Sequence, residues 1–348
     1  MKSPNIRQVA ALAGVSVSTV SACLNRPGRV AEATLLRVQA AMDQLGFVRN
    51  ESARQLRAGG GRCVGLIVPD MGNPFFTDVA RGAEVVLSSV GLDLTVCNSD
   101  GSTERESRYL DLFIEQRTCG ILISPLHIQL RQVEDARRHG IPVVLLDRHV
   151  PAGTEEPFTG CLVSVDDRLG GELATEHLLE RGHRRIAFVG GGGKVHQVSE
   201  RHVGAQLAME RVGHGGDKLV YLETTGHGVA DGRAAGQRLA GMSSRRRPTA
   251  AFCANDLVAF GLLQELIHQG ISVPDEVAVV GYDDIEFAAA AAVPLSSVRQ
   301  PRERLGASAA ELLLEEKGAQ DDHLHHQQIF EPELIVRDSS NFKLVGGA

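Results

Sequence analysis

The first 45 residues contain three segments in which apolar residues recur at helical spacing. The first, Ile6–Ala13, stops at Gly14, a residue that readily takes the left-handed conformation that ends a helix. Ser16 is a natural N-cap for a second helix over Val17–Leu24, and a third helix is expected over Glu32–Leu45. Two short helices joined by so tight a turn, with a third to close their core, predict a helix-turn-helix domain.

From residue 62 onwards, short apolar runs alternate with longer amphipathic segments. The runs predict strands at Cys63–Val68, Leu92–Cys97, Gly120–Ser124, Val143–Asp147, Leu162–Val165, Ile186–Val189, Leu219–Leu222, Ala250–Cys253 and Val277–Gly281. The segments between them predict helices at Phe75–Val90, Thr103–Gln116 and about 168–181, 199–212, 230–239 and 255–269. Such alternation is typical of doubly wound parallel sheets covered by helices on both faces. We therefore expect an α/β core of two lobes, with Leu295–Pro301 crossing back between them.

A hinge is predicted between these two parts. Asn50–Ala58 reads as a short helix followed by Gly59–Gly61, and a helix of this length is unstable alone in water. We expect it to fold only when another surface orders it. The expected domains are a helix-turn-helix domain at 1–48, a hinge helix and linker at 49–61, and a core at 62–348. Within the core, the first lobe is expected at about 62–161 and 293–322, and the second at about 162–292 and 323–340.

The charge is divided unevenly along the chain. The whole sequence has a net charge of −7, which by itself argues against a nucleic-acid partner. Residues 1–62, however, hold nine Lys and Arg against three acidic residues, a net of +6, and this leaves −13 for the remainder. A basic head on an acidic body is typical of a small DNA-binding module joined to a domain that does not contact phosphates.

Two segments resemble a known family. Gln8–Asn25, with the sequence QVAALAGVSVSTVSACLN, resembles the N-terminal signature of the LacI/GalR (lactose repressor/galactose repressor) family of transcriptional regulators, and Asn50–Arg57 resembles its hinge. The resemblance implies a repressor that binds a near-palindromic DNA operator as a homodimer. It also implies a core with the fold of two-lobed periplasmic sugar-binding proteins, which holds a small-molecule effector between its lobes.

The resemblance assigns base-reading positions to the second helix, which in a helix-turn-helix enters the major groove. These positions are Val17, Ser18 and Ala22. Ala22 lacks the hydrogen-bonding arm of the Arg or His often found in the family, so none of the three supplies a bidentate contact to guanine. Arg7, near the start of the first helix, is the expected substitute.

Other residues of the head and hinge are expected to hold the DNA in place. By resemblance, the backbone contacts are Ser16, Thr19, Ser21 and Asn25. Arg26 and Arg29 follow the second helix and are either phosphate contacts or solvated surface arginines. In the hinge, Leu56 matches the leucine that wedges into the minor groove and Ala53 its small neighbour, although Leu56 could instead pack on its own head domain.

Polar residues follow several predicted strands, at the edge where ligands of open α/β sheets bind. The candidate effector-binding residues are Asp70, Phe75, Ser124, Asp147, Arg148, Arg201, His227, Asn255 and Asp283. Of these, Asp147, Arg201, Asn255 and Asp283 match effector-contacting positions of the family, and His227 would replace an aromatic residue. Carboxylates and an arginine beside an apolar ring suit a sugar or a nucleoside-like ligand. The alternatives are structural: a helix cap at Asp256, a turn at Asp284 or a surface ion pair at Arg201.

No feature predicts an enzyme, a bound cofactor or a metal. Gly190–Lys194 resembles a nucleotide-binding loop, but Val195 stands where a P-loop needs Ser or Thr. The six cysteines are scattered and suggest ordinary buried thiols, and His323, His325 and His326 lie in a polar run that suggests a solvated loop. The competing functions are a sugar-binding protein or an enzyme without a DNA-binding role.

The two ends of the chain bear on its expected location in the cell and on its oligomeric state. The N-terminus has no long apolar stretch before a cleavage site, and no segment suggests a membrane span, so we expect a cytoplasmic protein without a membrane partner. The C-terminal sequence NFKLVGGA has no leucine heptad, so a dimer is expected rather than a tetramer joined by a coiled coil.

Overall fold

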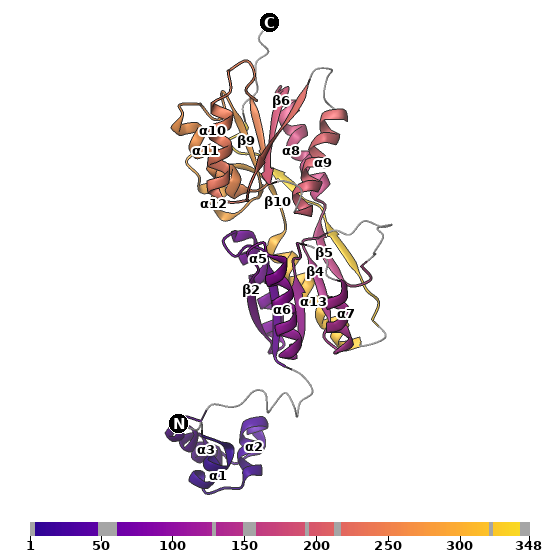
Figure 1. Ribbon diagram of the computed structural model, residues 1–348. Coiled ribbons are helices and arrows are strands. Elements are labelled where there is room, and N and C mark those ends of the chain that lie inside the picture. The colour runs from indigo at the N-terminus through magenta and orange to yellow at the C-terminus, as the bar shows by residue number, and fades with distance from the viewer. Residues whose placement is uncertain are drawn as a thin grey trace. The chain divides into compact units, whose positions relative to one another are not determined.

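Figure 1 shows the structure of the chain, a computed structural model. It describes residues 4–47, 61–126, 130–148, 158–191, 195–211, 217–319 and 323–341. The chain divides into two compact units, Met1–Gly61, here called the head, and Arg62–Ala348, here called the core. The predicted hinge helix, with Ala53 and Leu56, lies outside the described residues.

The head contains the three predicted helices. They are α1 (Ile6–Ala13), α2 (Val17–Asn25) and α3 (Glu32–Leu45), with a 3-10 turn η1 (Pro27–Arg29) between the last two. Asn5 begins α1, because its side chain accepts hydrogen bonds from the backbone N–H groups of Arg7 and Gln8. Gly14 ends α1 in the left-handed conformation, with φ of 66°, and the chain then enters α2.

Small apolar side chains from all three helices form the centre of the head. The buried residues are Val9, Ala10, Ala13, Val20, Cys23, Val38 and Ala41. A bend of 103° separates the axes of α1 and α2. Among the described residues no single helix is long and apolar enough to cross a membrane, and α1 and α2 meet that criterion only when taken together across their bend.

The first lobe of the core is a six-stranded sheet with the order β11-β5-β4-β3-β1-β2, in which all described pairs are parallel. Its strands are β1 (Cys63–Val68), β2 (Asp93–Asn98), β3 (Gly120–Ile123), β4 (Val143–Leu146), β5 (Leu162–Val165) and β11 (Gln327–Phe330). Its helices are α5 (Pro74–Ser89), α6 (Thr103–Glu115), α7 (Leu130–Arg138) and α13 (Arg302–Ala319). Residues of α5 and α13 pack against one face and residues of α6 and α7 against the other.

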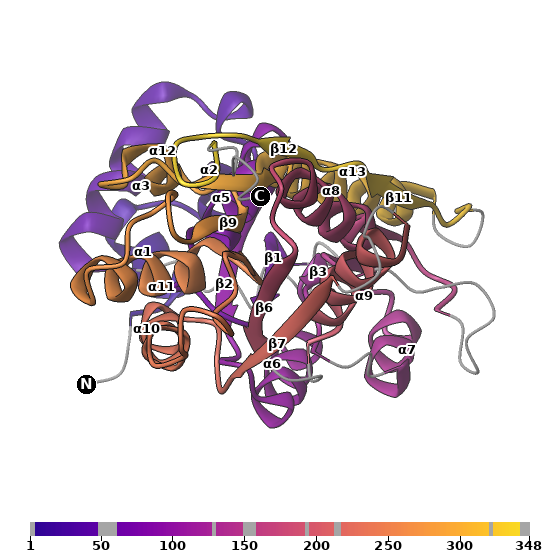
Figure 2. The same cartoon turned by 90° about the horizontal axis from the view of Figure 1, so that it is seen from above.

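The second lobe repeats this plan, with the strand order β12-β10-β9-β8-β6-β7. Its strands are β6 (Arg185–Gly191), β7 (Lys218–Thr224), β8 (Ala250–Cys253), β9 (Ala278–Asp283), β10 (Ser296–Arg299) and β12 (Glu333–Ile335), of which β12 is antiparallel to β10. Its helices are α8 (Asp167–Glu180), α9 (His196–Arg211), α10 (Val229–Ala240), α11 (Asp256–His268) and α12 (Glu286–Ala290). Figure 2 shows α8 and α9 on one side of this sheet and α10 and α11 on the other. The predicted doubly wound α/β core is confirmed.

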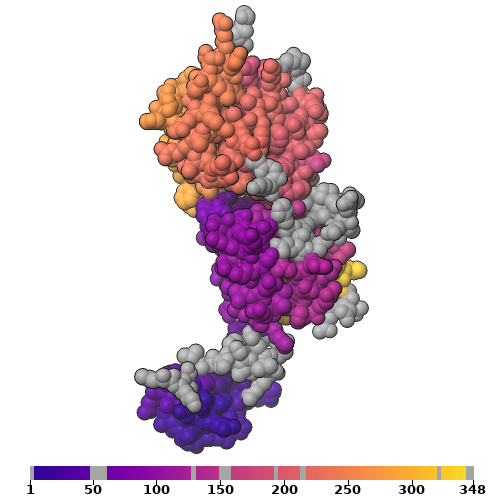
Figure 3. Space-filling view, viewed as in Figure 1, coloured from indigo at the N-terminus to yellow at the C-terminus, as the bar shows by residue number. Residues whose placement is uncertain are grey.

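The chain passes between the lobes at other residues than expected. Strand β5 was assigned to the second lobe but pairs with β4 in the first, and β10 was assigned to the first lobe but pairs with β9 in the second. Strand β11 also belongs to the first sheet, and Figure 3 shows the yellow, C-terminal part of the chain beside the magenta surface of the first lobe. An apolar run has the same pattern in either sheet, because only its hydrogen-bonding partner differs.

Three pairs of helices pack at close range through glycines. In each pair, a Cβ atom added to a glycine of either helix would overlap the backbone of the other helix. The pairs of glycines are Gly82 with Gly306, Gly171 with Gly204, and Gly232 with Gly261, and they join α5 to α13, α8 to α9, and α10 to α11. Glycine at these positions lets two backbones approach more closely than any side chain would allow.

Gly306→Ala is expected to lower the free energy of unfolding by about 1–3 kcal/mol, because its methyl group would overlap the carbonyl oxygen of Val79 in α5. Gly318→Ala is the matched control, since it lies in the same helix with no atom within 4 Å of the added Cβ. There we expect no loss, or a gain of up to about 1 kcal/mol from helix propensity. Urea unfolding followed by circular dichroism compares the two variants, and equal stabilities would show that α13 can move away from α5 without cost.

Candidate functional site

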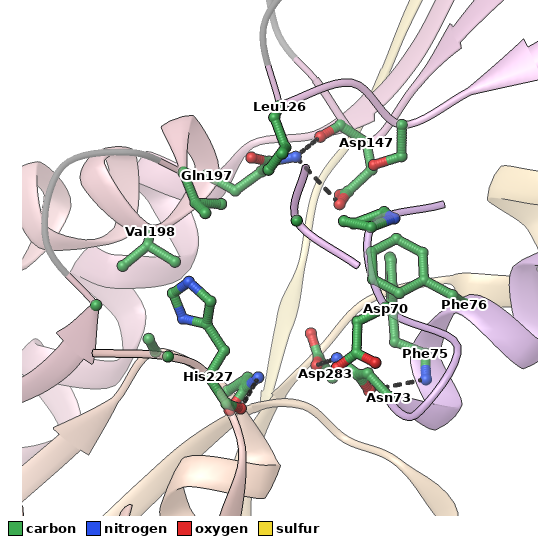
Figure 4. Close-up of a pocket in the computed structure, with 18 of the residues that line it drawn as sticks. Asp70, Asn73, Phe75, Phe76, Leu126, Asp147, Gln197, Val198, His227 and Asp283 are labelled. Atoms are coloured by element: carbon green, nitrogen blue, oxygen red, sulfur yellow. Dashed lines mark hydrogen bonds between the residues drawn. The ribbon is translucent and has the colours of Figure 1, made fainter. Parts of the chain in front are cut away.

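A cavity of about 760 Å³ lies between the two lobes, where strands of both sheets end. The close-up in Figure 4 shows side chains of both lobes pointing into it. Of the candidate effector-binding residues, the cavity is lined by Asp70, Phe75, Ser124, Asp147, Arg201, His227, Asn255 and Asp283. Eight of the nine candidates thus lie in the lining, and their contact with a ligand stays a prediction.

Arg148 is the exception among the candidates. It is not among the described residues that line the cavity, and its guanidinium donates a hydrogen bond of 2.7 Å to the carbonyl oxygen of Leu126. The nearby carboxyl of Glu106 is buried, and burial raises its pKa to about 7. Asp147, directly before Arg148, has φ of 52°, so the chain turns sharply here and only Asp147 faces the cavity.

Gln197 is a lining residue that the sequence did not reveal. Helix α9 begins at His196, three residues earlier than predicted, and this places Gln197 in its first turn. Its amide donates to the backbone oxygen of Asp147 and lies 3.3 Å from Oδ2 of the same residue. Because α9 belongs to the second lobe and Asp147 to the first, this side chain bridges the cavity (Figure 4). Its position two residues before the predicted start of the helix was the sequence feature that could have indicated a role in the cavity.

A second bridge lies on the opposite side of the cavity. The Asn73 amide in the first lobe donates 3.1 Å to Oδ2 of Asp283 in the second lobe, and its oxygen accepts from the backbone N–H of Phe75. The Gln300 amide donates 2.7 Å to the other carboxylate oxygen of Asp283. Asp283 has φ of 106°, a strained conformation for a residue other than glycine. Burial raises the pKa of its carboxyl, and Arg201 opposes that shift.

Arg201 is a buried cation at the inner wall of the cavity, not the surface ion pair of the alternative interpretation. Its Nε donates 2.8 Å to Oδ1 of Asp167, and its Nη1 donates 2.6 Å to the carbonyl oxygen of Ala254. The guanidinium also lies 3.6 Å from the centroid of the Tyr282 ring. Despite Arg201, burial raises the pKa of Asp167 and, together with the charge of Asp167, that of Asp147. Several buried carboxyls thus share one arginine.

Asn255 and His227 are joined by a hydrogen bond at the edge of the second lobe that faces the cavity. Asn255 is the N-cap of α11, a role that had been considered for Asp256, and its amide donates 3.0 Å to the carbonyl oxygen of His227. Asp256 is buried and accepts from Ser297 and from the backbone N–H of Ile285. Burial and the charge of Arg201 lower the pKa of His227, which favours its neutral form.

Three residues that line this cavity each have a buried polar atom without a hydrogen-bond partner among the described residues. These atoms are Oγ of Ser124, Oδ1 of Asp147 and Nδ1 of His227. A buried polar atom without a partner costs about 1–3 kcal/mol, so such atoms are rare unless a water or ligand satisfies them. Phe75 and Phe76 add an aromatic wall, with ring centroids 4.9 Å apart. Such a lining is compatible with a small polar molecule that has an apolar face.

The head presents the start of α2 to solvent. Ser16 caps the helix through a 3.1 Å hydrogen bond from the backbone N–H of Thr19, and its hydroxyl lies 2.7 Å from that of Ser18. Val17 is 43% exposed and Ser18 is exposed, whereas Ala22 is half-buried. Ser21 and Thr19 are half-buried, and the exposed residues are Arg7, Ser16, Asn25, Arg26 and Arg29. The arrangement leaves exposed hydroxyls at the start of α2 and exposed arginines after its end, and both kinds of side chain can contact phosphates.

The comparisons with known proteins agree with this arrangement. The family model for bacterial regulatory proteins of the lacI family matches residues 5–50, and a periplasmic binding protein-like domain matches residues 175–340. A curated relative, the HTH-type transcriptional repressor PurR of Vibrio atlanticus, is 36% identical over 338 residues, which cover 96% of this chain and 98% of the relative. The chain belongs to the LacI family.

Solved structures extend the likeness to the whole fold. A LacI family regulator from Silicibacter pomeroyi has a TM-score of 0.82 at 26% identity, with 97% of this chain and 99% of that chain covered. A regulator from Enterococcus faecium, solved with bound ribose, has a TM-score of 0.72 at 28% identity and covers 81% of this chain and 99% of its own. This LacI family member is therefore a DNA-binding transcriptional repressor with a ligand-binding domain, and not an enzyme.

Proposed function

We propose that this LacI family repressor binds a near-palindromic operator as a homodimer, and that a sugar or sugar derivative bound between its lobes controls that binding. The observation that carries the proposal is that Ser124, Asp147 and His227, each with an unpartnered polar atom, line one cavity together with Phe75. A sugar offers several hydroxyls that both donate and accept, and an apolar face of C–H groups for an aromatic ring.

The carboxyls favour a ligand that donates hydrogen bonds. Asp70, Asp147 and Asp283 line the cavity, and each carboxylate accepts from a hydroxyl, whereas Arg201 and Gln197 donate to hydroxyl oxygens. The ribose bound to the regulator from Enterococcus faecium supports this class of ligand. A purine-related effector is the second candidate, because curated relatives carry the name PurR and Phe75 could stack on a flat base.

Calorimetry with the purified protein separates these two classes of effector. The ligands are a panel of pentoses, hexoses, nucleosides and purine bases. We expect one class of sugar to bind, and Asp147→Asn to weaken its affinity roughly tenfold to a hundredfold through loss of a charge-assisted hydrogen bond. Asp93→Asn removes an exposed carboxylate outside the cavity and is the control. Binding of a purine base, with no binding of any sugar, would establish the second candidate instead.

The effector would act by changing how the lobes are held together. In the present structure Gln197 and Asn73 connect the lobes through Asp147 and Asp283, the same carboxyls that a ligand would contact. A ligand that replaces these bonds alters the relative stability of the lobe orientations, and in a dimer this alters the spacing of the two heads. The coupling must be reciprocal, so operator DNA is expected to change the effector's affinity by the same factor. An unchanged effector affinity in the presence of operator would exclude the mechanism.

Selection from a random duplex library tests the DNA-binding half of the proposal. We expect a near-palindromic sequence to be enriched, with an affinity that falls steeply with salt and weakens in Leu56→Ala. If the selection succeeds only when a ligand is added, the effector is a corepressor, and if the ligand releases the DNA, it is an inducer. Because its operator DNA would lie in the cytoplasm, we propose that this repressor is a cytoplasmic protein.

A further inference from the structure

A cluster of metal-ligating side chains lies in the first lobe, in a part of the core that the proposed function does not use. Cys161 directly precedes β5, Glu316 lies near the end of α13, and His323 and His325 belong to the segment that leads into β11. The segment was expected to be a solvated loop, and His325 and His326 are exposed, but His323 is half-buried and its Nε2 lies 3.1 Å from Sγ of Cys161. The lobe assembles these residues from three separate stretches of chain.

The spacing of the donor atoms matches a four-coordinate ion. All four lie within 4.8 Å of one another, and the individual separations are 3.1 Å from Cys161 Sγ to His323 Nε2, 3.6 Å from Cys161 Sγ to His325 Nδ1 and 3.8 Å from His325 Nδ1 to Glu316 Oε2. Tetrahedral zinc with ordinary bond lengths to S, N and O places its ligand atoms about 3.3–3.6 Å apart. The three individual separations lie close to this range, and the other three, which are at most 4.8 Å, would shorten where they exceed it.

The polar contacts around the cluster resemble the hydrogen bonds that orient the ligands of a bound metal ion. Oε2 of Glu316 is buried and has no hydrogen-bond partner among the described residues, while Oε1 of the same carboxylate lies 3.7 Å from Nε of Arg137. Arg137 would therefore orient the carboxylate and leave Oε2 for an ion. The backbone N–H of His326 points at Sγ of Cys161 at 3.5 Å, a contact that stabilises a thiolate.

The four side chains suit the charge of a divalent ion. One thiolate and one carboxylate would neutralise it, with the two imidazoles as neutral ligands. The proton of the thiol would leave to solvent when the metal binds.

The geometry points to a structural Zn²⁺ site formed by Cys161, Glu316, His323 and His325. A thiolate and two imidazoles select zinc over magnesium or calcium, and four protein ligands leave no open position for a substrate. The site would tie the end of α13 and the entry to the edge strand β11 to the start of β5. Cys161 lies at the amino end of its strand, whereas the effector cavity lies at the carboxyl ends, so the two sites are separate.

Cobalt is a direct probe of this coordination, used with untagged, metal-free full-length protein. We expect one Co²⁺ to bind per chain, with a sulfur-to-cobalt charge-transfer band and the intense visible bands of tetrahedral cobalt, and one Zn²⁺ to displace it. Zn²⁺ should also raise the melting temperature of the protein, because it binds only the folded state tightly.

Matched variants distinguish metal binding at this site from nonspecific binding to other thiols and imidazoles. Cys161→Ser should abolish the charge-transfer band, and His323→Asn should weaken binding by more than the roughly 10- to 100-fold expected for loss of an outer-shell partner. Cys97→Ser removes another half-buried thiol of the same sheet, and His326→Asn removes the neighbouring imidazole, and neither should change the affinity. The inference fails if less than one equivalent of metal binds, if the spectrum shows no thiolate, or if the Cys97 or His326 variant loses binding while the Cys161 variant keeps it.

Discussion

Arg201→Met is expected to lower the free energy of unfolding of the core by about 3–5 kcal/mol, the usual cost of removing one partner from a buried ion pair. The side chains of Arg201 and Asp167 are each 6% exposed and are joined at 2.8 Å. Methionine leaves the Asp167 carboxyl buried without its cation and also leaves the Ala254 carbonyl oxygen without its donor. The chain contains no Trp, so far-ultraviolet circular dichroism during urea unfolding is the suitable measurement.

Helix α9 supplies the control for this variant. Arg211 lies on the same helix and pairs with Glu172 and Glu176 of the same neighbour, α8, but it is 59% exposed. Arg211→Met should cost nothing measurable, because solvent screens an exposed pair. The double variant Arg201→Met with Asp167→Asn should recover part of the loss, since it removes both charges. Equal stabilities for the Arg201 and Arg211 variants would show that the buried pair does not stabilise the core.

His183 is expected to make the protein less stable as the pH falls from about 6.5 to about 4. The ring is 1% exposed, its Nδ1 lies 3.0 Å from Oγ1 of Thr249, and burial, with a smaller contribution from His177, lowers its pKa to about 4. The unfolded chain takes up the proton near pH 6.5 while the folded one resists it, so stability present above that pH is lost on acidification. The shift corresponds to about 3 kcal/mol.

His183→Asn removes this titration and can still hydrogen-bond to Thr249. The difference in unfolding free energy between the variant and the unmodified protein, measured by urea unfolding at several pH values, should therefore change by about 3 kcal/mol between pH 7 and pH 4. His268→Asn, which alters an exposed histidine at the end of α11, should run parallel to the unmodified protein. Parallel curves for His183→Asn as well would mean that His183 titrates alike in the folded and unfolded chains.

Most local features could be predicted because neighbouring residues determine them. Helices α1 and α3 and strands β1, β5 and β8 have the predicted bounds, since apolar periodicity, N-caps and glycine stops act within a few residues. The sequence of Gln8–Asn25 resembled the signature of the family, and the family match then confirmed that resemblance. Residues that follow strand ends predicted eight of the residues that line the cavity, because parallel strands of one sheet end at one edge.

Helix α13 and the short strands β11 and β12 escaped prediction for the opposite reason. Helix α13 is buried against both α5 and the first sheet, so its apolar residues do not form a single stripe, and the two strands are only four and three residues long. Their pairing partners lie more than 30 residues away in the chain. Local periodicity contains no information about such partners.

The sequence by itself determined that the protein is a two-part LacI family regulator, with a basic helix-turn-helix head and an α/β core whose strand ends carry polar side chains. Only the tertiary structure decided which lobe each late strand joins, that Gln197 rather than Arg148 faces the cavity, and that Cys161 meets Glu316, His323 and His325. The physical reason is distance along the chain. Periodicity and caps are local, whereas the neighbours of a side chain across a cavity or between two strands depend on how the whole core closes.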